Sequence, residues 1–398
     1  MQNNRIHGAI NYNMDKLKIK NFGPIKSVDV TFGDLTILIG PQASGKSLFL
    51  ELFKLIQDKA YVTDVLRRYN YILSQSDANP FLDYYFGEGL HSLFRDDTEI
   101  ECLGKGFSKN DLLLVSETNK QYKESVFYVP AQRILGISDG RPKNFMEFDG
   151  SAPFVLRNFS ETLRLFIQSG LGNPDIIFPM QTRLKGSICE SIDKSVFHGA
   201  EVVIDQSSGQ RKMKLHVGDT NLPFMTWSAG QKEFMPFLLA MYCLSGPSAS
   251  VVNKEDYKWV IIEEPEMGLH PRAIETVILQ IIELIQSGYK VVVSTHSPTL
   301  LEFAWVYESL KNLPAAQLGE ALCDLFDIKK DGNTVQIFDG LQDKVSKAYF
   351  FSAGKDGVES ADISSLDVGD ENPMISEWGG LSAFSGKASE VVSKYYQE

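Results

Sequence analysis

The chain contains 398 residues, of which 43% are hydrophobic and 23% are charged, and its formal net charge is −12 at pH 7. This balance is typical of a globular protein and excludes a wholly disordered chain, a collagen-like repeat and a coiled-coil rod. No apolar stretch is long enough to span a membrane and no secretory signal opens the sequence, so we expect a cytoplasmic protein with no membrane partner. The four cysteines form no C-x-x-C pair, and we expect them to be buried rather than to bind zinc.

The N-terminal part of the chain predicts short strands. Residues 1–14 are polar and are expected to form a flexible extension. Alternating apolar residues then predict two strands that flank a turn at Gly23-Pro24. The apolar segment Leu35–Ile39 predicts a buried strand, which runs into a glycine-containing loop and a buried helix from Leu48.

The middle of the chain has a mixed pattern. Further strands are predicted at residues 98–103, 111–116 and 126–129. Apolar residues at helical spacing predict an amphipathic helix over residues 154–167. Two strand-like segments around a Ser-Ser-Gly-Gln turn predict a hairpin within residues 201–217.

Strong periodicity returns after residue 226. The pattern predicts a helix over 227–242, a buried strand over 259–263, a helix after Pro271 and a buried strand over 291–294. Buried strands that alternate with long helices predict an α/β fold, in which helices cover both faces of a mainly parallel sheet.

The loop after the strand at Leu35–Ile39 reads G-x-x-x-x-G-K-[ST] and lies between a predicted strand and a predicted helix. Its glycines let the backbone wrap a phosphate, and the start of the helix supplies amide donors. Lys46 would neutralise phosphate charge and Ser47 would ligate Mg²⁺, so the motif predicts binding of ATP with magnesium. The predicted nucleotide ligands in this loop are Gly40, Gln42, Ser44, Gly45, Lys46 and Ser47.

Two acids stand at the end of the predicted strand 259–263. Carboxylates at the carboxyl end of a parallel strand face the ligand crevice. We therefore expect Glu263 to hold Mg²⁺ and Glu264 to orient or deprotonate an attacking water. A solvated acidic turn is the alternative. His296, which follows the strand at 291–294, could contact the γ-phosphate, although taken alone it is better explained as a structural histidine.

Taken together, these motifs resemble the head of ABC-type ATPases. The motifs recur in the family's order: Gly40–Ser47, Ser228–Gln231, Ile262–Glu266 and His296. The segments Leu17–Gly23 and Gly268–Pro271 resemble the OLD and SMC-like branch, which includes stand-alone ATPases of bacterial anti-phage defence, more than transporter subunits. The resemblance implies an antiparallel β subdomain and a helical lobe beside the parallel sheet.

The resemblance also implies roles for further residues. Ser228, Gly230 and Gln231 match the ABC signature, which in the family contacts the γ-phosphate held by the other subunit of a head-to-tail dimer. A simple helix N-cap at Ser228 is the alternative, and both roles can hold. His296 matches a residue that senses the γ-phosphate, and Gln132 falls near the glutamine loop that contacts nucleotide and metal. Asn21 and Phe22 are candidates for the adenine pocket by position.

The resemblance divides the chain into segments. After the extension 1–14, the first half of the ATPase core is expected over 15–133, and a helical lobe with a hairpin insertion over 134–226. The signature, strand-end acids and histidine would complete the core over 227–305, and 306–398 would be an acidic region open to a partner or oligomer contact. The sequence after His296 shows no acids clustered between buried strands, so we expect no nuclease domain in it.

Three functions remain open at this stage. The first is an ATPase that forms a homodimer or higher homo-oligomer and controls a separately encoded effector, such as a nuclease in anti-phage defence. The second is a repair or recombination ATPase that binds nucleic acid itself, and the third is an assembly scaffold stabilised by ATP. Basic side chains that could contact nucleic acid are Arg133, Arg141, Lys143, Arg157, Arg164, Arg211, Lys212 and Lys214.

Overall fold

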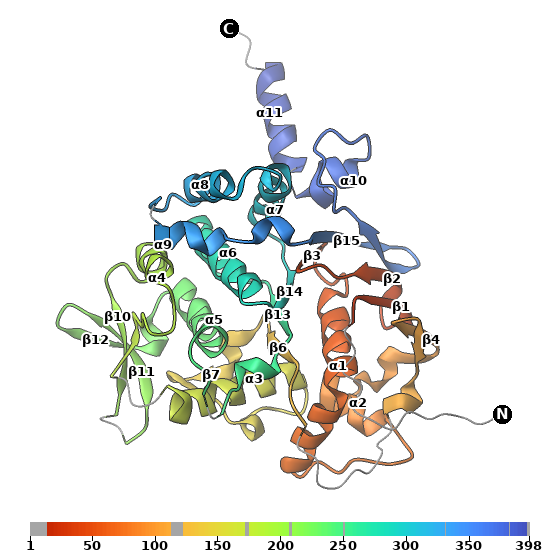
Figure 1. Cartoon of the computed structure of the whole chain (residues 1–398). Coiled ribbons are helices and arrows are strands. Elements are labelled where there is room, and N and C mark those ends of the chain that lie inside the picture. Colours follow the sequence, from red (N-terminus) through yellow and green to blue (C-terminus); the bar gives the residue numbers. More distant parts are fainter. Residues whose placement is uncertain are drawn as a thin grey trace.

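The computed structural model describes residues 14–112, 122–171, 175–206, 209–249, 251–330, 332–381 and 383–395. The largest sheet of the described residues has ten strands and runs from β4 on one side of the molecule to β6 near its middle (Figure 1). In spatial order its strands are β5 (Lys105–Phe107), β4 (Phe94–Cys102), β1 (Lys16–Phe22), β2 (Ile25–Thr31), β16 (Gly357–Asp362), β15 (Ser346–Gly354), β3 (Leu35–Ile39), β14 (Lys290–Ser294), β13 (Trp259–Glu263) and β6 (Val126–Val129).

The two halves of this sheet differ in strand direction. From β15 to β6 every neighbouring pair is parallel, whereas β5, β4, β1 and β2 form antiparallel pairs. Strands β3 and β13 are buried at every position, as expected for strands covered on both faces. The predicted α/β fold with a mainly parallel sheet and antiparallel strands is confirmed, and the antiparallel strands continue the same sheet.

The C-terminal region contributes two strands to the middle of the sheet. Strand β15 pairs in parallel with β3, and β16 pairs in parallel with β2. The sequence analysis predicted neither strand, because β16 has a single buried residue, Val358, and β15 ends in small residues. The predicted acidic region 306–398 therefore includes strands that join the two halves of the sheet, while the domain limits themselves stay predictions.

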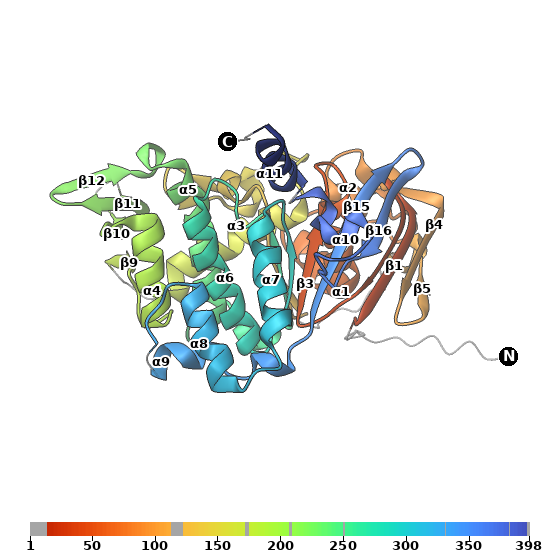
Figure 2. The same ribbon diagram turned by 90° about the horizontal axis from the view of Figure 1, so that it is seen from above.

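Helices cover both faces of the sheet (Figure 2). The first face packs against α1 (Lys46–Arg68) and α2 (Asn79–Phe86), and the antiparallel strands contribute to the same core. The second face packs against α4 (Gly186–Ile192), α5 (Ala229–Ser245), α6 (Pro271–Gln286), α7 (Pro298–Leu310) and α8 (Ala315–Leu325). Alternate strand residues separate the two cores: Ile261 faces the α1 side, and Val260 and Ile262 face the α5 side.

The lobe predicted as helical also contains strands. Helix α3 (Phe154–Leu165) contributes residues to both cores. A smaller antiparallel sheet contains β12 (Thr220–Pro223), β11 (Lys212–Val217), β10 (Glu201–Asp205) and β9 (Ile176–Phe178). Strands β10 and β11 form the predicted hairpin, although Ser207 and Ser208 at its turn lie outside the described residues. A two-stranded ribbon pairs β7 (Ile137–Ser138) with β8 (Arg141–Pro142).

The remaining predictions have mixed outcomes. The extension 1–14 lies outside the described residues except for Met14, which is buried. The predicted strand 111–116 is wrong in its first two residues, which belong to a 3₁₀ turn, and the rest lies outside the described residues. The described C-terminal region also contains two short helices, α9 (Gly332–Val335) and α10 (Pro373–Ser376), and a longer one, α11 (Ala383–Tyr395).

Two predictions from composition can be compared with the structure. All four cysteines are buried, as predicted, and burial raises the pKa of the Cys102 and Cys189 thiols to about 11. Among the helices of the described segments, none is long and apolar enough to cross a membrane.

Candidate nucleotide site

The predicted phosphate-binding loop connects β3 to α1. Gly40 has φ +149°, and a Cβ built on it would lie 2.3 Å from the Phe351 carbonyl oxygen of β15. Gly45 has φ +76° and directly precedes α1, whose start has no side-chain cap. Glycine is therefore required at both positions, and the first amides of α1 are left for an anion.

Lys46 begins α1 and is buried under the loop. Its Nζ donates to the Gly40 carbonyl at 2.9 Å, to the Pro41 carbonyl at 3.0 Å and to Ser44 Oγ at 3.1 Å. Burial lowers the pKa of Lys46, while the charges of Glu264, Glu266 and Glu263 oppose that shift. The predicted phosphate ligand and the strand-end acids thus lie near one another.

Glu263 ends β13 and is buried beside Ser47. Burial raises the pKa of its carboxyl group, whereas the nearby Ser47 hydroxyl, Ala131 amide and Tyr128 hydroxyl favour the ionised form. Ala131 N donates to Oε2 at 3.3 Å, but Oε1 has no hydrogen-bond partner among the described residues. A buried carboxylate oxygen without a donor, next to a hydroxyl oxygen, fits the hard oxygen ligands that Mg²⁺ prefers.

Glu264 and His296 lie next to each other at neighbouring strand ends. Glu264 has φ +41°, a left-handed conformation that is uncommon for a residue with a side chain, and its N–H donates to the Ser294 carbonyl at 2.8 Å. Its Oε1 lies 3.4 Å from His296 Nε2. The two side chains are 32% and 30% exposed, so both can be reached from solvent.

Glu266, to which the sequence analysis gave no role, holds the loop that carries His296. Its Oε1 accepts hydrogen bonds from Thr295 Oγ1 at 2.7 Å, from His296 N at 2.6 Å and from Ser297 N at 3.1 Å. The fourth residue of the Glu-Glu-Pro-Glu segment therefore positions the backbone of the histidine loop. The signal in the sequence was its place in the motif Ile262–Glu266, two residues after Glu264.

Arg133 is fully buried behind the strand-end acids. Its Nη1 donates to the carbonyl oxygens of Glu263 and Glu264 at 3.3 Å each. Its Nε donates to the Glu233 carbonyl of α5 at 3.0 Å. This side chain thus binds the turn after β13 and the helix that begins at the predicted signature.

Three side chains that were candidates for contact with a ligand are buried, so the structure removes them as candidates. Arg133 and Arg157 are 0% and 1% exposed, so neither can contact nucleic acid. Arg157 instead donates to Tyr71 Oη and to the Tyr84 carbonyl. Phe22 packs against Phe86 and Phe94, with ring centroids 5.8 Å and 5.0 Å away, so it cannot stack on adenine.

Most of the other basic candidates already have partners in the chain. Arg141 pairs with Glu147, Arg164 with Glu161, Lys212 with Asp139 and Lys214 with Asp205. Arg211 donates to the Ile167 carbonyl at 3.3 Å, and the Lys143 ammonium lies 5.1 Å from the Phe148 ring centroid.

The predicted signature residues form the start of α5. Ser228 and Gln231 make a capping box, in which Gln231 N donates to Ser228 Oγ and Ser228 N donates to Gln231 Oε1, both at 3.2 Å. The Ser228 side chain is exposed. Helices α5 and α1 pack on opposite faces of the sheet (Figures 1 and 2), so the structure does not bring the signature to the phosphate-binding loop of the same chain.

Gln132 lies between two residues of the site. Its neighbour Ala131 donates its N–H to Glu263, and Arg133 follows it. The Gln132 side chain is exposed, and its role toward nucleotide or metal stays a prediction.

Comparisons with known proteins agree with the predicted family. Residues 35–302 match the family described as AAA domain, putative AbiEii toxin, Type IV TA system. A segment of 72 residues is 33% identical to the Old nuclease of Escherichia phage P2, and it covers 18% of this chain and 12% of that protein. The chain therefore matches about an eighth of the length of that curated relative.

Solved structures of SMC heads also align with the chain. An SMC head bound to the C-terminal winged-helix domain of ScpA has 11% identity and a TM-score of 0.39, and the alignment covers 88% of this chain and 97% of that one. The SMC head domain of Thermotoga maritima has 12% identity and a TM-score of 0.35, with 88% and 98% covered. The predicted resemblance to ABC-type ATPases of the OLD and SMC-like branch is confirmed by the family match and the Old nuclease segment.

Proposed function

Because the chain belongs to the family described as AAA domain, putative AbiEii toxin, Type IV TA system, we propose that it hydrolyses ATP to ADP and phosphate. The observation that carries this proposal is the convergence at the carboxyl ends of three parallel strands. Lys46 follows β3, Glu263 ends β13 with Glu264 directly after it, and His296 follows β14. Ligands bind at this edge in open parallel sheets.

Each residue has a chemical role in the proposed reaction. Lys46 and the first amides of α1 bind the phosphates and neutralise their charge. Glu264 accepts a proton from the attacking water, and its exposure leaves room for that water. His296, at 3.4 Å from Glu264, lies where it can contact the γ-phosphate or orient the same water.

Ser47 and Glu263 are the protein groups that would hold Mg²⁺. The unpartnered Glu263 Oε1 supports this assignment, and Gln132 is a further candidate ligand. When bound, the ion would offset the negative charge of the phosphates.

The predicted head-to-tail dimer has a physical basis at α5. A helix start with a serine hydroxyl and free amides attracts anions. Ser228 is exposed there, while α5 and α1 belong to different faces of the sheet. A second chain is therefore the natural source of the phosphate that Ser228, Gly230 and Gln231 would contact.

We further propose that dimer closure on ATP and opening after hydrolysis control a separately encoded effector, such as a nuclease in anti-phage defence. The family description names a toxin–antitoxin system, and one relative is a phage nuclease, which supports a role of this kind. Direct binding of nucleic acid has less support, because two of its candidate residues are buried and most others are paired.

The test uses the variant Glu264→Gln, which keeps the shape of the side chain but cannot accept the proton. We expect hydrolysis to fall by roughly 10²- to 10⁴-fold while ATP binding persists. Light scattering should show a dimer that accumulates with ATP in the variant and dissociates in the wild type after turnover. The variant Glu88→Gln, at an exposed site on the loop after α2, is the matched control. Wild-type turnover in Glu264→Gln would remove this residue as the base.

A further inference from the structure

Arg133 connects three segments that are distant in sequence. Within the described chain its hydrogen bonds go to the carbonyl oxygens of Ala131, of the turn Glu263–Pro265, and of Glu233 in α5. The guanidinium is thus a buried cation held by backbone carbonyls on both sides. The three nitrogens of this planar group reach carbonyls on opposite sides of it, which the single nitrogen of a lysine cannot do.

A second contact between α5 and the turn does not involve Arg133. A Cβ built on Gly230 would lie 2.9 Å from the Gly268 carbonyl oxygen, so the start of α5 packs closely on the backbone after the strand-end acids. Gly268 has φ +71°, and a Cβ on it would lie 3.2 Å from Glu233 Cγ. Backbone packing and the Arg133 bonds therefore join the same two segments.

The turn held in this way contains the base of the proposed reaction. Glu264 has a left-handed backbone conformation, which persists only when its surroundings hold it. Two peptide groups flank Glu264, one on each side. Arg133 donates to the carbonyl oxygens of both, which belong to Glu263 and Glu264. A movement of α5 would consequently reach the two peptide groups that flank Glu264 through Arg133, while the Gly230–Gly268 contact lies further along the turn.

We propose that Arg133 is a positioning residue that couples the start of α5 to the catalytic turn, so that an anion bound at α5 sets the position of Glu264 in the same chain. This inference rests on the proposed function. In a head-to-tail dimer, the phosphate at α5 would belong to the nucleotide of the partner, so each ATP would influence hydrolysis of the other. Hydrolysis should then depend cooperatively on ATP concentration.

The experiment compares the full-length wild type with Arg133→Lys and Arg157→Lys. Arg157 is a matched control, because it is equally buried and also bonds a backbone carbonyl, but at Tyr84. We expect a sigmoidal dependence of rate on ATP in the wild type and in Arg157→Lys. Arg133→Lys should give a hyperbolic curve and a kcat lowered by roughly tenfold or more, with ATP affinity changed by less than about threefold. Wild-type kinetics in Arg133→Lys, or the same loss in both variants, would overturn the proposal.

Hydrogen exchange separates this inference from the proposed function. In Arg133→Lys the amides of residues 229–233 and 264–268 should both exchange faster than in Arg157→Lys, whether or not ATP is hydrolysed. If the wild type has no ATPase activity, the proposed function fails, yet the exchange result still tests the coupling. If Arg133→Lys does not fold, hydrogen exchange of the wild type is compared with and without ATP. The exchange rates of residues 229–233 and 264–268 should then change together. A change in only one of these segments would contradict the coupling.

Discussion

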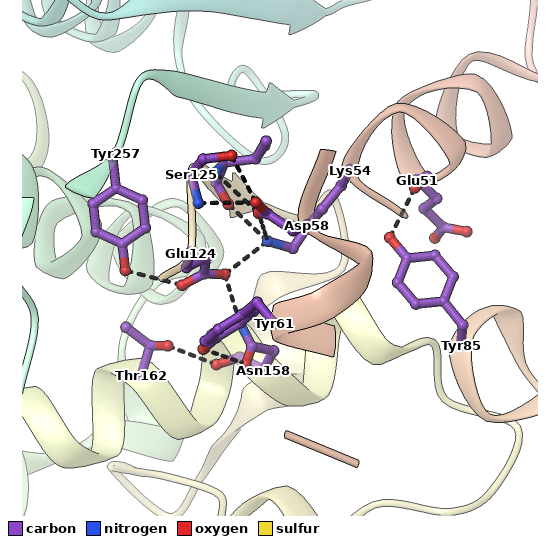
Figure 3. A network of polar contacts seen from close by, with 11 residues as sticks. Glu51, Lys54, Asp58, Tyr61, Tyr85, Glu124, Ser125, Asn158, Thr162 and Tyr257 are labelled. Carbon is purple, nitrogen blue, oxygen red and sulfur yellow. Dashed lines mark hydrogen bonds and ion pairs between the residues drawn. The ribbon is translucent and has the colours of Figure 1, made fainter. Parts of the chain in front are cut away.

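Two groups of charged residues lie beside α1, one around Lys54 and one around Lys46, and their hydrogen bonding differs. The first, centred on Lys54, lies between α1, the start of β6 and α3 (Figure 3). Lys54 Nζ contacts Asp58 Oδ2 at 3.1 Å, Glu124 Oε1 at 2.7 Å and the Val126 carbonyl at 2.7 Å, which uses its three donors. Burial disfavours the charge on Lys54, but Glu124 and Asp58 outweigh that effect and its pKa is raised.

The second group contains Lys46 and the acids at the end of β13. Lys46 bonds only carbonyl and hydroxyl oxygens, and Glu263 and Glu266 each have one oxygen without a partner among the described residues. Buried charges are costly unless they are paired. The Lys54 group is therefore complete within the chain and stabilises the fold, whereas the second group suits a cation and a polyanion supplied from outside.

The largest expected effects come from replacing each lysine by methionine. Lys54→Met leaves Asp58 and Glu124 buried without their cation, and should lower the free energy of unfolding by about 3–5 kcal/mol. Lys46→Met should change stability little but weaken ATP binding by roughly 10- to 100-fold. Denaturant unfolding and nucleotide titration on both variants would measure the two effects. If Lys54→Met and Lys46→Met lost the same free energy of unfolding and the same affinity for ATP, the distinction between the two groups would be contradicted.

In the group around Lys46, Glu266 is the residue whose hydrogen bonding is most like that of the Lys54 group. Its Oε1 accepts three hydrogen bonds from within the chain. Glu266→Ala removes the acceptor for the backbone of His296 and Ser297, so kcat should fall by roughly 10- to 100-fold with little change in ATP affinity. Glu266→Gln keeps an acceptor at that position, and its amide nitrogen would replace the oxygen that has no partner. Rescue by Gln but not by Ala identifies hydrogen bonding as the role; equal losses in both would assign it to the charge.

A third, smaller effect concerns the pH dependence of magnesium binding. Burial raises the pKa of Glu263 above the ordinary 4.5, so its neutral form persists to higher pH than in an exposed carboxyl group. Protons should therefore compete with Mg²⁺ as the pH falls through that raised pKa. Below the pKa, the Mg²⁺ concentration needed for half-saturation should rise by roughly tenfold for each pH unit. Hydrolysis measured over a matrix of pH and Mg²⁺ concentration tests this. Glu263→Gln should flatten the dependence, and the same slope in that variant would contradict the assignment.

The sequence predicted the parts of the site that are contiguous along the chain. The loop from Gly40 to Ser47 and the strand that ends at Glu263 are local patterns, and the structure shows both between the predicted elements. Contacts between distant segments were not predictable in this way. Arg133 meets Glu263 across 130 positions, and a single sequence gives no signal that a basic side chain will bind carbonyls rather than solvent.

The same reason applies to the fold. Strand β15 lies against the phosphate-binding loop through the Phe351 carbonyl and Gly40, yet its sequence has few apolar residues in alternation. Lys54 and Glu124 are 70 positions apart, and each alone resembles a surface charge. Periodicity predicts which elements form, while long-range hydrogen bonds between charged and polar groups decide how these elements are held.

The smallest prediction tests the Lys54 group from its edge, by removal of one hydroxyl at a time. Tyr257 Oη donates to Glu124 Oε2 at 2.9 Å, whereas Tyr61 Oη donates to the neutral Asn158 Oδ1 at 3.2 Å. Hydrogen bonds to charged groups contribute more to stability, so Tyr257→Phe should cost about 1.5–3 kcal/mol and Tyr61→Phe about 0.5–1.5 kcal/mol. Denaturant unfolding of the two variants gives the difference. Equal costs would mean that Glu124 is not charged in the native state, and the group would then be a neutral network rather than a set of paired ions.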